Sequence, residues 1–401
     1  MSEQQISIPR PDDWHVHVRD GAVLAAVIND TAAVFGRAII MPNLTPPVTT
    51  SALARAYRNR ILAALRPGSA FEPLMTCYLT DTTEPADLRA GFADDVLVAA
   101  KLYPAGATTN AEAGVTRIDR LDPVFDEMQS LGMPLLVHGE VVDPRVDVFD
   151  REAVFIERTL SRIVERFPRL PVVLEHVTTR QGIEFVAGAG PQVAATLTPH
   201  HLLINRNAMF TGGIRPHFYC LPVAKREEHR LALCEAATSG NPKFFLGTDS
   251  APHVNAAKES ACGCAGVYNA ATALACYAQV FDDMGRLDRL PRGLRGQIRR
   301  RVLRPAGQRR HGHAAACCRA APPATGARRR RRNHVISPRY AGMLANRGRA
   351  AVSCDAGPAP FGHDAGVARL RPRAHLASLQ HIHGSAARVR GRERCGRASA
   401  T

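Results

Sequence analysis

Hydrophobic segments of four to eight residues recur along the first 284 residues, and longer stretches with helical spacing separate them. Leu53, Tyr57, Ile61 and Leu65 lie four residues apart and predict a helix over residues 51–66, and similar spacing predicts helices over 152–167 and 270–284. The short segments are rich in branched side chains, which favours β-strands. They span residues 13–18, 38–41, 73–78, 96–103, 134–138, 171–177, 193–198 and 243–247.

Eight strands that alternate with helices predict a parallel sheet. Eight strand–helix units in roughly 270 residues suit a closed (β/α)₈ TIM-type barrel. A doubly wound open sheet is the structural alternative, but no Gly-x-Gly-x-x-Gly follows the first strand, as it does in dinucleotide-binding sheets of that kind. We therefore predict one barrel domain over residues 1–284.

Charge divides the chain where the strand–helix pattern ends. Residues 1–284 contain 25 Lys and Arg against 32 Asp and Glu, whereas residues 285–401 contain 27 Arg, no Lys and four acidic residues. The net charge of +16 therefore comes from the second part, in which 71 of 117 residues are Ala, Gly, Pro or Arg. Such a composition buries little hydrophobic surface, so we predict a disordered tail over residues 285–401. A basic tail also suits a nucleic-acid binder. Any polycation, however, binds nucleic acid weakly and without specificity at low salt, so we expect no specific nucleic-acid partner.

Targeting signals are not evident in the sequence. No run of about 18 apolar residues is present to span a membrane, and the first residues lack the basic start and apolar core of a secretory signal. Ten cysteines without an export signal are typical of reduced thiols. We therefore expect a cytoplasmic protein without a membrane segment.

Polar side chains end or follow six of the eight predicted strands. In a parallel barrel the carboxyl ends of all strands face one rim, where active sites form. The residues that this geometry places at the rim are His15, His17, Asn43, Lys101, His138, His176 and Asp249.

His15 and His17 alternate with hydrophobic residues. The period of a strand places both imidazoles on one face, towards the barrel mouth, and Trp14, Val16 and Val18 on the other, towards the helices. Alone, this pair is more typical of half-buried or surface histidines than of a metal site. Together with the other histidines and the aspartate at the rim, it favours a divalent metal such as zinc.

Lys101 and Asp249 add reactive groups to this set. Residues 1–284 contain 21 Arg but only four Lys, so a lysine within a hydrophobic strand indicates a need for amine chemistry. A buried amine has a lowered pKa and can react with carbon dioxide to form a carbamate that bridges two metals. From the residues alone, a lysine paired with a carboxylate is an equally good interpretation. Asp249 can bind metal and also take a proton from metal-bound water.

Several sequence strings resemble those of the bacterial single-chain dihydroorotases of the amidohydrolase superfamily. They are Asp-Trp-His-Val-His-Val-Arg-Asp at 13–20, Met-Pro-Asn-Leu at 41–44, Lys-Leu-Tyr-Pro at 101–104, Pro-Leu-Leu-Val-His-Gly-Glu at 134–140 and Gly-Thr-Asp-Ser-Ala-Pro-His at 247–253. The His-x-His and the aspartate are shared across the superfamily, whereas the longer strings are more specific. The resemblance runs nearly continuously from about residue 8 to residue 284 and then stops.

The resemblance implies a reaction and a set of ligands. Enzymes of this family interconvert N-carbamoyl-L-aspartate and L-dihydroorotate in pyrimidine biosynthesis, with two zinc ions, a bridging hydroxide and an aspartate as general acid and base, here Asp249. Lys101, in its N6-carboxylated form, would bridge the two ions. One zinc would be held by His15, His17 and Asp249, and the other by His138 and His176.

The resemblance also implies how a small-molecule substrate is held, and that the protein is a homodimer. The substrate carboxylate would contact Arg19, Asn43 and His253, and other substrate atoms would contact His138, Leu221 and Ala265. Thr108 and Thr109 would form a lid over the substrate. From the residues alone, Arg19 could instead form a salt bridge with Asp20, and Thr108 and Thr109 could belong to an ordinary polar turn.

Other functions remain open from the sequence. Another cyclic-amide hydrolase, such as a hydantoinase or allantoinase, is the nearest alternative, and the carboxylate-binding residues argue against it. The GC-rich codons of Ala, Gly, Pro and Arg suggest that residues 285–401 come from a shifted reading frame, against the alternative of a genuine basic tail. In that case the protein could also be an inactive product.

Overall fold

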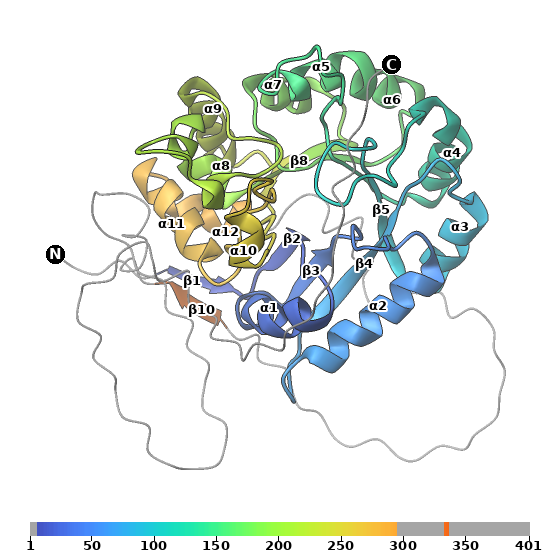
Figure 1. The fold of residues 1–401 in the computed structure, drawn as a ribbon, viewed down its shortest axis with the longest axis horizontal. Coiled ribbons are helices and arrows are strands. Elements are labelled where there is room, and N and C mark those ends of the chain that lie inside the picture. The colour runs from blue at the N-terminus through green and yellow to red at the C-terminus, as the bar shows by residue number, and fades with distance from the viewer. Residues whose placement is uncertain (1–5, 295–332, 337–401) are drawn as a thin grey trace. The chain divides into compact units, whose positions relative to one another are not determined.

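Eight strands form one parallel sheet in the computed structural model, which describes residues 6–294 and 333–336. Strands that follow each other along the chain are neighbours in the sheet, without the reversal of a doubly wound sheet. This order confirms the predicted barrel (Figure 1). The strands are β2 (Asp12–Val16), β3 (Arg37–Ile40), β4 (Glu72–Tyr78), β5 (Leu97–Leu102), β6 (Leu135–Val137), β7 (Val172–Leu174), β8 (Val193–Leu197) and β9 (Phe244–Leu246).

The first and last strands of this sheet meet at a seam. Val16 of β2 forms a parallel bridge with Ser250, which follows β9, and the backbone N–H of His17 donates to the carbonyl of Ser250 at 3.0 Å. The buried carboxylate of Asp13 accepts hydrogen bonds from the backbone N–H and the hydroxyl of Thr248, at 2.8 and 2.5 Å. These contacts close the barrel beside the residues that the sequence analysis places at the rim.

Helices surround the barrel (Figure 1), and no helix in the described ranges is long and apolar enough to cross a membrane. The predicted helix over residues 152–167 contains one π-helical turn, Ile156–Leu160, between α5 and α6. The α-helices are α1 (Gly21–Val34), α2 (Ser51–Ala64), α3 (Pro85–Ala93), α4 (Asp122–Leu131), α5 (Arg151–Phe155), α6 (Ser161–Arg166), α7 (Arg180–Gly188), α8 (Pro199–Leu203), α9 (Glu227–Thr238), α10 (Asn255–Lys258), α11 (Ala273–Asp283) and α12 (Leu290–Gly293). The 3₁₀ turns are η1 (Ile118–Leu121), η3 (Arg206–Met209), η4 (Pro216–Phe218) and η5 (Leu287–Arg289).

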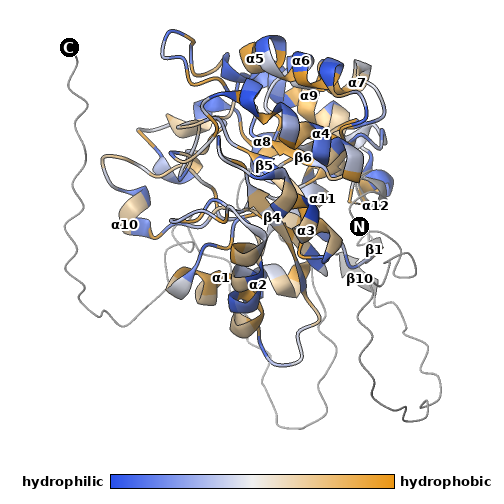
Figure 2. Ribbon diagram, turned by 90° about the vertical axis from the view of Figure 1, so that its right-hand side faces the viewer, coloured by the Kyte–Doolittle hydropathy of each residue, from blue (hydrophilic) through white to orange (hydrophobic). Residues whose placement is uncertain are grey.

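Hydrophobic side chains pack in two layers, because successive residues of a strand point to opposite faces of the sheet. The outer layer lies between the strands and the helices, and Figure 2 shows that these helices carry both hydrophobic and hydrophilic residues. The inner layer fills the barrel and takes one residue from each strand: Trp14, Ile39, Leu74, Ala99, Leu136, Val173, Ala194 and Phe245.

The position of Trp14 in this inner layer corrects one expectation. Alternation along residues 14–18 predicts that Trp14 points towards the helices, with Val16 and Val18, but only the two valines pack there. The pairing of β2 with β3 shifts register between Asp13 and Val16, which breaks the alternation of the strand. Trp14 therefore points into the barrel, where its ring lies 6.0 Å from that of Phe245.

Two short strands lie outside the barrel sheet. β1 (Ile6–Pro9) pairs antiparallel with β10 (Asn333–Ile336), a pairing that the sequence analysis does not anticipate. Packed structure also continues beyond residue 284, because Leu290 and Leu294 are buried in the outer layer. The expected disorder is therefore wrong for residues 285–294. The expectations for residues 295–332 and 337–401, including the shifted reading frame, fall outside the residues that the structure describes.

The seam generates a stability prediction. Thr248→Val keeps the side-chain shape but removes a donor to the buried Asp13 carboxylate, so it should lower the free energy of unfolding by about 1.5–3 kcal/mol. Burial raises the pKa of Asp13 to about 6, and measurement at pH 8 keeps this carboxyl ionised. Thr248→Ser retains the hydroxyl and should cost less. Urea unfolding followed by circular dichroism compares the two, and equal losses would contradict a role for the hydrogen bond.

Candidate active site

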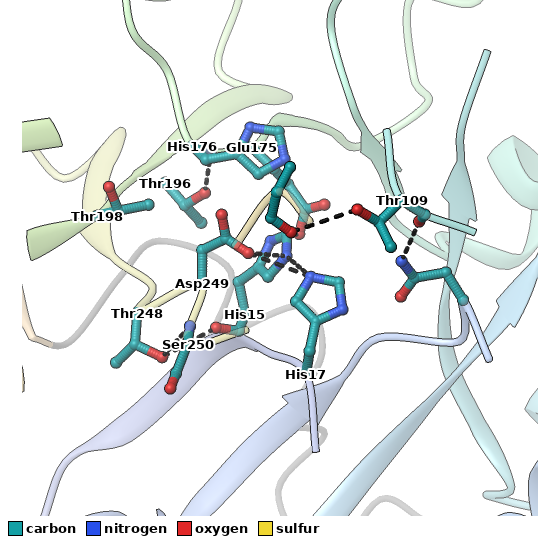
Figure 3. A network of polar contacts seen from close by, with 12 residues as sticks. His15, His17, Thr109, Glu175, His176, Thr196, Thr198, Thr248, Asp249 and Ser250 are labelled. Carbon is teal, nitrogen blue, oxygen red and sulfur yellow. Dashed lines mark hydrogen bonds and ion pairs between the residues drawn. The ribbon is translucent and has the colours of Figure 1, made fainter. Parts of the chain in front are cut away.

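The six residues proposed as metal ligands lie together, buried, at the mouth of the barrel. Lys101 is part of β5 and His15 of β2, and the others follow the ends of β2, β6, β7 and β9. Figure 3 shows His15, His17, His176 and Asp249 with their polar ends towards one another. The exposed fraction is 8% or less for each member of the set, His15, His17, Lys101, His138, His176 and Asp249.

Three of these side chains converge on one point. Nε2 of His15 and Nε2 of His17 are 3.2 Å apart, and they lie 3.3 and 3.1 Å from Oδ1 of Asp249. Ligand atoms about 2.0–2.1 Å from a tetrahedral zinc ion are separated by about 3.3 Å. The His15–His17–Asp249 cluster therefore has the spacing of a metal site.

His176 and His138 extend the cluster to one side. The ring of His176 lies 5.1 Å from that of His15 and 4.8 Å from that of His138. Nδ1 of His176 is buried without a hydrogen-bond partner, and burial lowers the pKa of this imidazole well below its usual value. A buried, neutral and unpartnered nitrogen is a suitable metal ligand. Nε2 of His138 instead lies 3.0 Å from Oε2 of Glu140.

Glu175 is the residue of the cluster that the sequence analysis missed. Its carboxylate is fully buried, contacts Nζ of Lys101, and lies 2.9 Å from Nδ1 of His15. A carboxylate on Nδ1 orients an imidazole so that Nε2 faces a metal. Its position at the end of β7, directly before His176, is the signal that could have indicated it. The contact with Lys101 matches the carboxylate-paired lysine that the sequence left open.

Burial and charge together set the ionisation of the cluster. Burial lowers the pKa of Lys101 despite the attraction of Glu175, and lowers that of His17 to about 3. Burial also acts to lower the pKa of His15, but the charges of Glu175 and Asp249 outweigh it and raise that pKa to about 9. Negative charge that draws a proton to His15 also attracts a divalent cation.

Backbone strain coincides with the site. Non-glycine residues rarely adopt positive φ angles, and such residues concentrate at functional sites. Arg19, His176 and Asp249 have φ angles of 57°, 43° and 44°. Backbone hydrogen bonds hold two of them, from the N–H of His176 to the Thr196 hydroxyl at 2.7 Å and from the N–H of Asp249 to the His15 carbonyl at 2.8 Å.

Arg19 lies beside His253 next to the cluster. Nε of Arg19 donates to the carbonyl of Pro252 at 3.1 Å, and Nη2 lies 3.1 Å from Nε2 of His253. The alternative of an Arg19–Asp20 salt bridge does not hold, because Asp20 pairs with Arg60. Burial and the charge of Arg19 lower the pKa of His253 to about 4, so this imidazole is neutral at pH 7. A guanidinium beside a neutral imidazole suits an anionic ligand.

The proposed lid residues contact this same region. The amide of Asn43 donates to the carbonyl of Thr109 at 3.0 Å, and the hydroxyl of Thr109 donates to the carbonyl of Ala265 at 3.3 Å. Thr108 accepts a backbone hydrogen bond from Ala111 at 3.2 Å, as in a turn. Oδ1 of Asn43 is buried without a partner, which leaves an acceptor for a ligand.

The remaining predicted substrate contact, Leu221, is half-buried between Cys220 and Pro222.

A second group with metal-ligand spacing consists of His200, His201 and Cys220, the last of which directly precedes Leu221 in the sequence. Hydrogen bonds account for His201, whose Nδ1 and Nε2 lie 2.8 Å from the Thr198 hydroxyl and 2.9 Å from the Pro222 carbonyl.

Known proteins with similar sequences share this barrel region. The model of the amidohydrolase family matches residues 12–290. A dihydroorotase from Azoarcus sp. (strain BH72) is 63% identical over 287 residues, which cover 72% of this chain and 83% of the relative. A dihydroorotase from Aromatoleum aromaticum is 64% identical over 287 residues, with the same coverage.

Solved structures give the same result. The crystal structure of a dihydroorotase from Campylobacter jejuni is 31% identical, with a TM-score of 0.70 over 88% of this chain and 95% of that one. A dihydroorotase from Saccharomyces cerevisiae in complex with 5-fluoroorotic acid is 34% identical, with a TM-score of 0.67 over 72% and 83%. An L-hydantoinase from Arthrobacter aurescens, 19% identical with a TM-score of 0.63 over 74% and 72%, shares the fold. The chain belongs to the amidohydrolase family and, within it, groups with the dihydroorotases.

Proposed function

We propose that the barrel is a zinc-dependent dihydroorotase, which interconverts N-carbamoyl-L-aspartate and L-dihydroorotate plus water. The dihydroorotases that are 63–64% identical over 287 residues support this activity. The observation in the structure that carries the proposal is the convergence of His15, His17 and Asp249, with three ligand atoms 3.1–3.3 Å apart.

Two zinc ions fit the residues at the mouth. His15, His17 and Asp249 would hold one ion, and His176, with its unpartnered Nδ1, would hold the other together with His138. When bound, the metals would lower the pKa of a water molecule and polarise the amide carbonyl of the substrate.

Lys101 is proposed to bridge the two ions as its N6-carboxylated form. Burial lowers the pKa of its amine, which favours the neutral form that attacks carbon dioxide. The new N–C bond forms a carbamate, and one proton leaves the nitrogen. The product is an anion beside Glu175, so it requires the positive charge of metals to be stable at this buried position.

Asp249 is proposed as the general base and acid. In ring opening, it accepts a proton from the attacking water and delivers it to the departing ring nitrogen. In ring closure, it accepts a proton from the ureido nitrogen as that nitrogen attacks the carboxyl carbon, and it returns the proton to the carboxyl oxygen that leaves as water. Burial acts to raise its pKa, but His15 and His17 hold the pKa well below the usual value, so it starts as the base.

The anion-binding residues favour dihydroorotate over a hydantoin. Arg19, His253 and Asn43 are proposed to bind the substrate's free carboxylate, which simple hydantoins lack. Arg19 contacts His253, and Asn43 is connected to His253 through Thr109 and the Ala265 carbonyl. The similarity to the L-hydantoinase concerns the fold alone.

We also propose that the protein is a homodimer and that it is located in the cytoplasm. Sedimentation velocity tests the oligomeric state, and cell fractionation tests the location.

The two-metal site predicts the behaviour of a lysine variant. Wild-type protein should carry about two zinc equivalents by mass spectrometry, whereas Lys101→Ala should lose metal and most activity, with partial rescue by short carboxylic acids. Lys243→Ala, which alters a lysine just before β9, is the control and should keep both ions. An active, metal-replete Lys101→Ala protein would refute the carbamate bridge.

The anion-binding role predicts a different result for Arg19→Met. Zinc content should remain near normal, while kcat/KM for dihydroorotate falls roughly 10- to 150-fold, as expected for the loss of a charge-assisted contact of about 1.5–3 kcal/mol. Arg37→Met is the control, because Arg37 pairs with Asp12 at the amino end of the strands. An unchanged kcat/KM in Arg19→Met would contradict the substrate assignment.

A further inference from the structure

Lys258, at the end of α10, is buried with 4% of its surface exposed. Its Nζ donates to three backbone carbonyls, those of Tyr219, Cys264 and Gly266, at 2.9, 2.6 and 2.9 Å. These carbonyls belong to two loops without regular secondary structure. One ammonium group therefore joins the loop at residue 219 to the loop over residues 264–266.

Two of the three acceptors flank Ala265, whose own carbonyl faces the proposed substrate site. That carbonyl lies 2.9 Å from Nε2 of His253 and accepts a hydrogen bond from the Thr109 hydroxyl at 3.3 Å. It thus orients the imidazole beside Arg19 and holds the proposed lid. A displacement of residues 264–266 would move both contacts.

The backbone around Gly266 shows how closely this loop is packed. Gly266 has a φ angle of +148°, and a Cβ atom there would lie 2.7 Å from the carbonyl oxygen of Ala251. Its N–H donates to the carbonyl of Tyr219 at 3.0 Å, the same oxygen that accepts from Lys258. Small movements of the loop are therefore transmitted to the segment that follows Asp249.

We propose that Lys258 is a positioning residue, which fixes the loop over residues 264–266 so that His253 is placed to bind the substrate carboxylate and Thr109 is placed in the lid. The proposal rests on the dihydroorotase function and extends it to a residue that contacts neither the metal ligands nor the substrate. Burial lowers the pKa of Lys258 to about 8, so the amine is still mostly protonated at pH 7.

The choice of lysine in an arginine-rich sequence supports this role. A tetrahedral ammonium directs three N–H groups from one atom, whereas a guanidinium spreads its donors across a plane. Lys243 shows the same arrangement away from the site, where its Nζ donates to the carbonyls of Val186, Ala187 and Ala189 at the end of α7. It provides a matched control with the same chemistry and no connection to the substrate.

The experiment compares Lys258→Met, Lys258→Arg and Lys243→Met in the full chain. For each protein, KM and kcat for dihydroorotate, zinc content and melting temperature are measured at pH 7. We expect both Lys258 variants to raise KM about tenfold or more, with kcat changed less than about threefold and zinc content normal. Lys243→Met should lower the melting temperature while KM stays unchanged.

Other outcomes would overturn either the role of Lys258 or the dihydroorotase function. An unchanged KM in Lys258→Arg or Lys258→Met would overturn the proposal, and so would a rise in KM of equal size in Lys243→Met. If both Lys258 variants fail to fold while Lys243→Met folds, Lys258 supports the fold rather than the site, and the proposal is also overturned. Wild-type protein without dihydroorotase activity would instead refute the proposed function.

Discussion

The carboxylates of Glu175 and Asp249 lie almost fully buried at the barrel mouth, and buried charges require compensating charges or donors around them. In the protein itself, Lys101 and His15 supply this compensation, through a contact with Glu175 and a raised imidazole pKa. The same carboxylates attract divalent cations, which is why this mouth is a candidate metal site. The closed barrel can hold so many ionisable groups close together because they lie on, or directly after, five different strands.

Around this charged centre, the residues proposed to bind substrate lie in loops, and other contacts must hold these loops in place. The structure provides them by different means: a left-handed backbone at Arg19, a carbonyl contact between Ala265 and His253, and the three hydrogen bonds of Lys258. The barrel and the loops therefore have separate sources of order. Strand pairing fixes the candidate metal ligands, and side-chain to backbone hydrogen bonds fix the residues proposed to bind an anion.

Strand positions and the rim residues could be predicted from the sequence, because burial and period-two patterns are local properties. The inward orientation of Trp14 could not, since a register shift between two strands depends on both partners. Glu175 was missed because the carboxylate of a strand-end glutamate has many possible partners, and only the fold brings it to Lys101. Lys258 was missed for the same reason: its three acceptors are main-chain atoms, which the sequence does not distinguish.

The seam between β2 and β9 has a consequence for synthesis of the protein. Asp13 and Thr248 are 235 residues apart along the chain, and at about 5–20 residues added per second roughly 10–50 s separate their appearance on the ribosome. Throughout that interval β2 has one unpaired edge, and such edges associate with other chains. The nascent barrel is therefore most vulnerable to aggregation until its last strand emerges, and Asp249, which follows that strand, completes the set of candidate metal ligands.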